Sequence, residues 1–237
     1  MKNTLLLLVF ITLFLSCEDT KKASIKKETP LPITEKKSSQ KIEKEATIEV
    51  TKYPKITQEN VVEFLMKYGK ENPETKVRIT TLQGIIEVEL FKDTPLHRAN
   101  FIYLAKQGYF NDTFFHRLVP NFIIQAGSSD NKSTSKKRSS IGDNYRIPYE
   151  KGSGSIHQKG TLSGAKYYRK NPDNMSVPFE FFIFLGPKSS TKHLNGKYTI
   201  FGKVTKGMEV VNTIADLPTD DGEWPIDNVY IKVEVVE

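Results

Sequence analysis

The sequence contains a single cysteine, Cys17, among its 237 residues. One thiol cannot form an intramolecular disulfide, and it leaves no cysteine cluster to hold a metal ion. The four histidines show no spacing typical of metal ligands; they are His97, His116, His157 and His193. The sequence therefore predicts neither a disulfide-rich fold nor a metal centre, and no cofactor is expected.

The chain also lacks an apolar run long enough to cross a bilayer, which requires about 20 residues. Lys2 is followed by an uncharged stretch, residues 3–16, with two short apolar segments inside it. This pattern is typical of a secretory signal peptide. The sequence at its end, Leu15-Ser16-Cys17, resembles the lipobox of bacterial lipoproteins, although Phe14 stands where leucine is most frequent.

The lipobox resemblance implies that residues 1–16 are a lipoprotein signal peptide and that Cys17 is acylated and becomes the new N-terminus. Several acyl chains would anchor the protein stably, because each buried CH₂ contributes about 0.8 kcal/mol. We therefore expect a protein of the cell envelope, held by lipid on a bacterial membrane outside the cytoplasm. A cleavable signal followed by an incidental cysteine is the alternative.

Positive charge is not gathered on one element. The net charge of +7 is spread over the N-terminal segment and one later loop, which argues against a nucleic acid partner. Residues 17–56 are rich in Lys, Glu, Ser and Thr and contain few large apolar residues. Such a segment cannot bury enough surface to offset its chain entropy, so we expect a lipidated, disordered tether.

A helical pattern follows the tether. Its apolar residues recur at helical spacing: Val61, Phe64, Leu65 and Tyr68. Thr57 is placed to cap this helix and Gly69 to end it. Because one short apolar stripe needs a surface to pack on, residues 57–75 are expected to form a helix and linker that lie against the domain at residues 76–237.

Two further helical patterns occur within that domain. Thr94 as N-cap, Pro95 at the first helical position and Gly108 past the end frame the first helix. The second covers Met208–Leu217. Between them, residues 128–140 are polar and basic, and we expect a solvated loop there.

Short strand patterns make up most of the remaining domain. Two strands flank Gln83-Gly84 within Val77–Leu90, and Val229–Val236 alternates as a closing strand. No βα unit repeats along the chain. The pattern therefore predicts a mainly β fold, a closed or nearly closed antiparallel β-barrel capped by helices.

The segment Phe115–Gly127 brings together a cation, apolar side chains and an amide: Arg117, Phe122, Ile123 and Gln125. In an extended strand alternate side chains share a face, so Ile123 and Gln125 should point the same way. A Pro-Asn pair before Phe122 predicts a turn. Such a set could hold a short peptide without an acid–base pair. A buried β-hairpin whose arginine pairs with a carboxylate is the alternative.

The order of motifs from Val77 to Glu237 resembles the cyclophilin family of peptidyl-prolyl cis/trans isomerases. Six blocks agree in order: T-x-x-G-x-I-x-V-E-L, P-x-x-x-x-N-F, F-H-R-L-V-P-N-F-I-I-Q-A-G, G-T-L-S-x-A, F-F-I and L-N-G-K-Y-T-I-F-G-K-V. The resemblance implies an eight-stranded closed antiparallel barrel capped by two α-helices. It also implies rotation of X-Pro peptide bonds as the activity and proline-containing polypeptides as the partners of a protein that we expect to be a monomer.

The resemblance also assigns roles to individual residues. Arg117 matches the catalytic arginine, Gln125 the amide that binds substrate backbone, and Ala165 the position whose backbone meets the residue before proline. Tyr198 stands where many members have histidine. The matches to the walls of the proline pocket are Phe122, Ile123, Phe182 and Leu194.

Three positions depart from the family pattern. His193 replaces the tryptophan of the best-known members, which argues against tight cyclosporin binding. Glu180 stands where glutamine is usual, and Lys166 where asparagine or arginine is usual, so both could retune the binding of substrate. The segment 167–178 is longer than in compact members. These three residues favour the competing hypothesis, a non-catalytic peptide-binding or chaperone module.

Overall fold

The computed structural model describes residues 53–152 and 156–236. The predicted signal peptide, the predicted lipidation site Cys17 and almost all of the predicted tether lie outside the described residues. Within the described ranges no helix is both long enough and apolar enough to cross a membrane.

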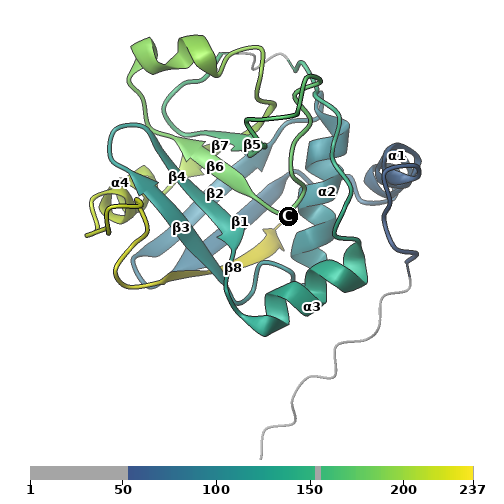
Figure 1. The fold of residues 1–237 in the computed structure, drawn as a ribbon, viewed down its shortest axis with the longest axis horizontal. Helices are drawn as coiled ribbons and strands as arrows, with labels where there is room; N and C mark the ends of the chain where they lie inside the picture. The colour runs from purple at the N-terminus through teal and green to yellow at the C-terminus, as the bar shows by residue number, and fades with distance from the viewer. Residues whose placement is uncertain (1–52, 153–155, 237) are drawn as a thin grey trace, which may run out of the picture. The chain divides into compact units, whose positions relative to one another are not determined.

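Eight antiparallel strands form a closed barrel in the order β1-β2-β7-β5-β6-β4-β3-β8 (Figure 1). The barrel closes because β1 pairs with β2 on one side and with β8 on the other. The strands are β1 Lys76–Thr81, β2 Gly84–Leu90, β3 Thr113–Val119, β4 Ile123–Ser128, β5 Thr161–Gly164, β6 Phe181–Phe184, β7 Ile200–Lys206 and β8 Val229–Val236. The predicted barrel, its first hairpin and its closing strand are thus confirmed.

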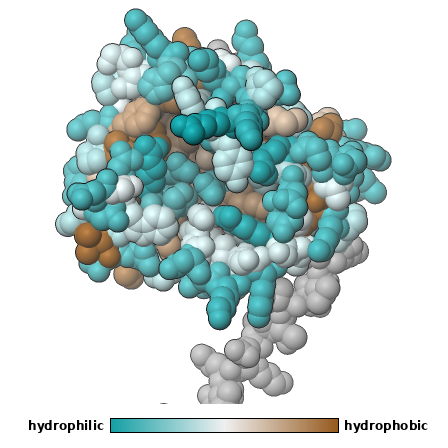
Figure 2. All heavy atoms as spheres, viewed as in Figure 1, coloured by the Kyte–Doolittle hydropathy of each residue, from teal (hydrophilic) through white to brown (hydrophobic). Residues whose placement is uncertain are grey.

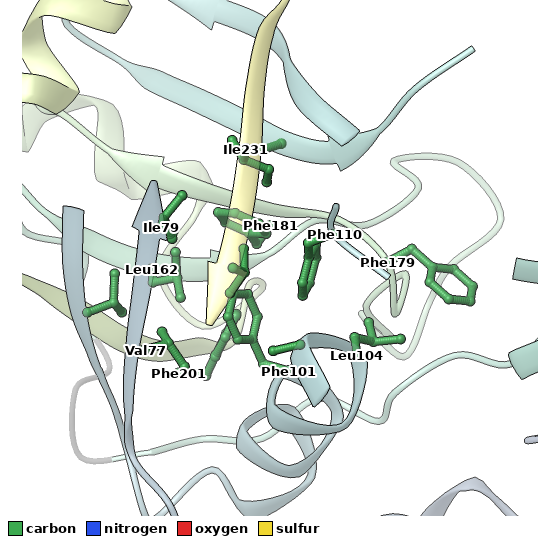
Figure 3. Packing of buried hydrophobic residues seen from close by; sticks show 14 of the residues in the cluster. Val77, Ile79, Phe101, Leu104, Phe110, Leu162, Phe179, Phe181, Phe201 and Ile231 are labelled. Atoms are coloured by element: carbon green, nitrogen blue, oxygen red, sulfur yellow. The ribbon is translucent and has the colours of Figure 1, made fainter. Parts of the chain in front are cut away.

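Alternate side chains along a strand point into the barrel and fill its interior. In β8, Val229, Ile231 and Val233 are buried, whereas the residues between them are exposed. Figure 3 shows Ile231 facing side chains from other elements, among them Phe181 of β6 and Phe101 of a helix. Fully burying one such side chain contributes about 1.5–3 kcal/mol. The core therefore fixes the strands that carry the site on their outer faces.

Helix α2, Pro95–Lys106, begins at Pro95 as predicted and ends just before Gly108, whose φ is +61°. Thr94 occupies the N-cap position, but its hydroxyl contacts the carbonyl of Phe91 at 3.4 Å instead of capping the helix. Helix α4, Met208–Ala215, confirms the second predicted helix. The two helices lie on opposite sides of the barrel in Figure 1.

Helix α1, Val61–Glu71, packs on α2 as expected, but both of its predicted ends are wrong. Asn60 occupies the N-cap position, and its side-chain oxygen accepts the backbone N–H of Thr57 at 2.8 Å. Gly69 lies within the helix. A Cβ there would be only 2.9 Å from the Cβ of Ala99, so this glycine permits close packing rather than ending the helix.

The basic segment 128–140 is not a solvated loop, because most of it forms helix α3, Lys132–Ile141. The helix buries only Thr134 and Ile141, so its sequence has no apolar stripe to reveal it. Cations fix it in place instead. The ammonium group of Lys137 donates to the carbonyls of Gly108 and Asn111 at 3.0 Å each.

Candidate active site

The strands β3 and β4 form the predicted hairpin around a tight turn. In the turn, the N–H of Phe122 donates to the carbonyl of Val119 at 2.9 Å, and Asn121 has φ +60°. The register shifts between Phe115 and Arg117, which marks a bulge or irregularity in β3. Such a bulge re-aims the side chains beside it. Arg117 consequently lies opposite Gln125 of β4.

Three predicted site residues are register partners on three neighbouring strands. Arg117 of β3 pairs with Gln125 of β4, and Gln125 pairs with Phe182 of β6. Residues directly opposite each other in a sheet present their side chains on the same face. The cation, the amide and an aromatic ring therefore form one row across the outer surface of the barrel.

A small apolar cluster, distinct from the barrel core, lies beside this row. Its buried members are Ile123, Phe182, Phe184 and Leu194, with Val119, Phe122 and Tyr198 packed against them. All five predicted pocket and wall residues are thus brought together. In Figure 2 hydrophobic residues appear between hydrophilic ones at the upper left, where Figure 1 places the turn between β3 and β4.

Sequence reasoning missed Phe184, which also belongs to the apolar cluster. Strand β6 alternates, with Phe181 and Ile183 in the barrel core and Phe182 and Phe184 in the outer cluster. Because Phe182 was already predicted to face the pocket, the period of two along a strand could have identified Phe184.

Ring contacts give the apolar cluster a defined shape. The rings of Phe182 and Tyr198 meet edge to face with centroids 5.7 Å apart. Phe122 lies 5.8 Å from His193, which ends the short 3-10 helix η1, Lys188–His193. The structure therefore brings His193 next to Phe122, another predicted site residue.

His157 packs against the apolar cluster, a contact with no signal in the sequence. Its ring stacks on Phe182 at 6.0 Å, with 5° between the planes. Its Nδ1 lies 2.8 Å from Asn195 Oδ1, and its Nε2 lies 3.1 Å from Ser163 Oγ. Burial lowers the pKa of His157 despite the hydrogen bond to Asn195. His157 therefore packs on Phe182 while both of its ring nitrogens have hydrogen-bond partners.

Glu180 lies beside Gln125. Its Oε2 accepts the Gln125 amide N–H at 3.0 Å and lies 3.6 Å from His116 Nε2, while Arg138 of α3 is 3.7 Å from Oε1. Burial alone would raise the pKa of Glu180, but His116, Arg138 and Gln125 outweigh it and hold the pKa below its usual range. A carboxylate can only accept, so Gln125 has to present its NH₂ to Glu180.

The carbonyl oxygen of Gln125 is consequently left for a donor. With glutamine at position 180, either orientation of the Gln125 amide could be satisfied. Glu180 therefore fixes the amide orientation of a predicted substrate-binding residue.

Lys166 and Ala165 lie at the other end of the predicted site. The Lys166 ammonium is 4.7 Å from the centre of the Tyr198 ring and donates to Asn174 Oδ1. Burial, with a contribution from Lys197, lowers the pKa of Lys166. The N–H of Ala165 donates to the carbonyl of Glu180 at 3.2 Å, and its carbonyl accepts the N–H of Val177 at 2.8 Å. Both backbone groups predicted to lie at the substrate therefore already have a partner within the fold.

Arg117 pairs with Glu223, a carboxylate that the sequence did not indicate as its partner. The Arg117 Nε lies 2.6 Å from Glu223 Oε2. The arginine is 38% exposed and stands beside the apolar cluster. The alternative, a buried β-hairpin whose arginine pairs with a carboxylate, is therefore correct about the ion pair and about the hairpin, since most residues of β3 and β4 are buried. Within the described ranges, no group of three or more His, Cys, Asp or Glu side chains could hold a metal ion.

A closed eight-stranded antiparallel barrel carries an arginine, an amide and an apolar cluster on its outer face, and its fold is of the cyclophilin type. The family model described as "Cyclophilin type peptidyl-prolyl cis-trans isomerase/CLD" matches residues 76–235. This chain belongs to that cyclophilin family, and it is a peptidyl-prolyl cis-trans isomerase as the resemblance predicted.

Similar curated proteins cover different shares of this chain. A peptidyl-prolyl cis-trans isomerase of Acinetobacter baylyi is 35% identical over 61% of this chain and 74% of its own length. The isomerase-like protein 1 of Aspergillus fumigatus is 36% identical over 69% and 96%. The isomerase-like protein 2 of Rhizopus delemar is 36% identical over 77% of this chain, but only 33% of that longer protein is covered.

A solved structure shows the same fold. The cyclophilin type peptidyl-prolyl cis-trans isomerase of Cryptosporidium parvum, crystallised in the presence of the dipeptide Ala-Pro, superposes with a TM-score of 0.56. It is 31% identical, and the alignment covers 68% of this chain and 99% of that one. The eight-stranded cyclophilin barrel is thereby confirmed.

Proposed function

We propose that this isomerase rotates X-Pro bonds in exported proteins, with Arg117 as its catalytic residue and the apolar cluster as its proline pocket. The observation that carries this proposal is the row formed by Arg117, Gln125 and Phe182 on three neighbouring strands. Phe182 belongs to the cluster that would hold the proline ring, and Gln125 lies between that wall and the arginine.

The reaction requires little chemistry beyond this row. A peptide bond resists rotation by about 18–20 kcal/mol, because its nitrogen shares a lone pair with the carbonyl. The cis and trans forms of an X-Pro bond differ by only about 1 kcal/mol, yet they interconvert in tens to hundreds of seconds. Catalysis therefore consists of binding the twisted amide more tightly than either planar form.

Arg117 supplies that differential binding. In the twisted state the proline nitrogen becomes pyramidal, and its lone pair can accept a hydrogen bond. A positively charged donor in a partly dry site stabilises this state more than the planar amide. The apolar cluster holds the ring while the other side of the bond turns, and removal of water disfavours the charge-separated planar form. Gln125 holds the peptide backbone through the carbonyl that Glu180 leaves free.

The catalytic role of Arg117 is tested by kcat/KM on a short X-Pro peptide. We expect Arg117→Ala to lower kcat/KM about 10²–10³-fold, as loss of one preorganised donor does elsewhere. Arg78→Ala is the matched control, since Arg78 is a half-exposed arginine of β1 that likewise pairs with a carboxylate, Glu87. An inert wild type that still binds unfolded protein would instead favour the chaperone hypothesis.

We also place this activity at a bacterial membrane, outside the cytoplasm. The order of Lys2, an uncharged apolar stretch and Cys17 supports lipid attachment. Labelled palmitate should be incorporated into the wild-type protein and not into Cys17→Ser. Label retained by that variant would exclude Cys17 as the anchor, whatever the result of the isomerase assay.

A further inference from the structure

We propose that Glu223 is a positioning residue for the isomerase reaction, holding the guanidinium of Arg117 in the direction that the twisted amide requires. This inference rests on the catalytic role proposed for Arg117. Glu223 belongs to the loop at residues 218–226, which precedes β8 and is called the Glu223 loop here.

The contact leaves the catalytic donors free. Glu223 Oε2 accepts the N–H of Arg117 Nε at 2.6 Å. Nε carries one of the five N–H donors of an arginine, and the other four are on the two terminal nitrogens. Because the guanidinium is planar, a fixed Nε restricts the directions in which the terminal nitrogens point.

The charge of Arg117 also reaches the proline pocket. Burial and the neighbouring Tyr168 raise the pKa of the Tyr198 hydroxyl, whereas Arg117 acts in the opposite direction. The guanidinium therefore acts on Tyr198, a wall of the apolar cluster, while it is bonded to Glu223.

The backbone of Glu223 is fixed beside the arginine. Its carbonyl accepts the N–H of Leu118, the residue after Arg117, at 2.8 Å, and its own N–H donates to the carbonyl of Asp220 at 3.1 Å. Its φ is +65°, a region that non-glycine residues rarely occupy. The side chain and the backbone of one residue thus bind two successive residues of β3.

The rest of the Glu223 loop maintains this conformation. Asp220 Oδ1 accepts the backbone N–H groups of Gly222 and Trp224 at 2.8 and 2.9 Å. The Trp224 ring meets Phe114 edge to face at 5.5 Å and lies 5.9 Å from the His116 ring. Asp220 therefore holds the loop together from within, while Glu223 and Trp224 attach it to β3, and an attached loop can position a catalytic side chain.

Loss of the contact should slow catalysis more than binding. A half-exposed arginine without its partner samples several rotamers, and few of them place a donor at the twisted amide. We expect Glu223→Ala to lower kcat about three- to fivefold, the rate equivalent of one exposed ion pair. KM should stay within twofold, because Glu223 contacts the arginine and not the proline pocket.

The experiment uses the full chain and measures kcat and KM on one X-Pro peptide. Glu223→Gln should recover most of the rate, because its amide oxygen still accepts from Nε. Asp221→Ala is the matched control, since it removes an acidic side chain that is exposed in the same loop. In an Arg117→Ala background Glu223→Ala should have no further effect, because a positioning residue acts only through the residue it positions.

Trp224, the sole tryptophan, reports whether the loop keeps its packing. If Glu223→Ala changes the Trp224 emission, Glu223→Gly is used as the truncated variant instead, because glycine adopts φ +65° without strain. Unchanged or higher kcat in the truncated variant would overturn the positioning role. So would an equal loss in Asp221→Ala, or an equal loss in the Arg117→Ala background. Full activity of Arg117→Ala would refute the proposed function itself, and the positioning role with it.

Discussion

Replacing Glu180 by glutamine should destabilise the protein at neutral pH and not in acid. The carboxylate is 24% exposed and accepts one hydrogen bond from Gln125, while His116 and Arg138 lie within 3.7 Å of it. Glutamine keeps the shape and the acceptor for Gln125, but it removes the charge that His116 and Arg138 stabilise. The substitution therefore isolates the electrostatic part of the network.

The magnitude follows from the same contacts. A hydrogen bond to a charged group contributes about 1.5–3 kcal/mol, but here one acceptor remains, and Arg138 is 3.7 Å from the carboxylate and partly exposed. We expect a loss of about 1–2 kcal/mol in the free energy of unfolding, a decrease of roughly 2–8 °C in Tm for a domain of this size. The pKa of Glu180 is lowered in the fold, so this stabilisation is complete above about pH 4.3, the unfolded value, and is lost as the pH falls through the lower folded value.

The assay is thermal unfolding of both proteins between pH 7 and pH 3. The difference in Tm should be largest at pH 7 and should vanish at the acid end. Glu89→Gln serves as a control, because Glu89 forms an exposed pair with Lys203 on β2 and β7 and should change Tm little. A Tm difference that is absent at pH 7, or that persists unchanged at pH 3, would refute the stabilising role of the Glu180 charge.

Three further substitutions test the pocket and the packing that carries it. Phe182→Ala should lower kcat/KM on the X-Pro peptide about 5- to 30-fold, because it removes the ring that packs edge to face on Tyr198. Gly127→Ala should destabilise the fold by more than about 2 kcal/mol in urea titration, because its Cβ would lie 2.1 Å from the Phe179 carbonyl oxygen at φ +101°. Gly69→Val should loosen α1 from α2, seen as faster amide exchange in α1, while kcat/KM stays within twofold.

Strong local patterns predicted most of the barrel. The predicted start of α2 at Pro95 and its end before Gly108 were correct. Proline suits the first helical position, and glycine suits the positive φ just past the end. The alternation of β8 was also correct. Helix α3 was missed because it is held by Lys137 and Arg138 rather than by an apolar stripe. A hydrophobic pattern cannot predict a helix that is attached through its lysine and arginine side chains.

The candidate site was predictable where one strand brings residues together and where the family motifs match. Phe182 and Leu194 could be placed with Phe122 only through the resemblance, because nothing local links segments so far apart. Glu223 and His157 were missed. Each acts through a contact between segments that are distant along the chain, and no periodicity encodes such a contact.

The most direct test of the central claim is the cis/trans exchange rate of an X-Pro peptide bound at saturation, measured by NMR exchange spectroscopy for wild type and Arg117→Ala. Saturation separates rotation from binding. We expect both proteins to bind the peptide through Phe122 and Phe182, with exchange at least about 10²-fold slower in the variant. Equal exchange rates in the two bound complexes would contradict the catalytic role of Arg117.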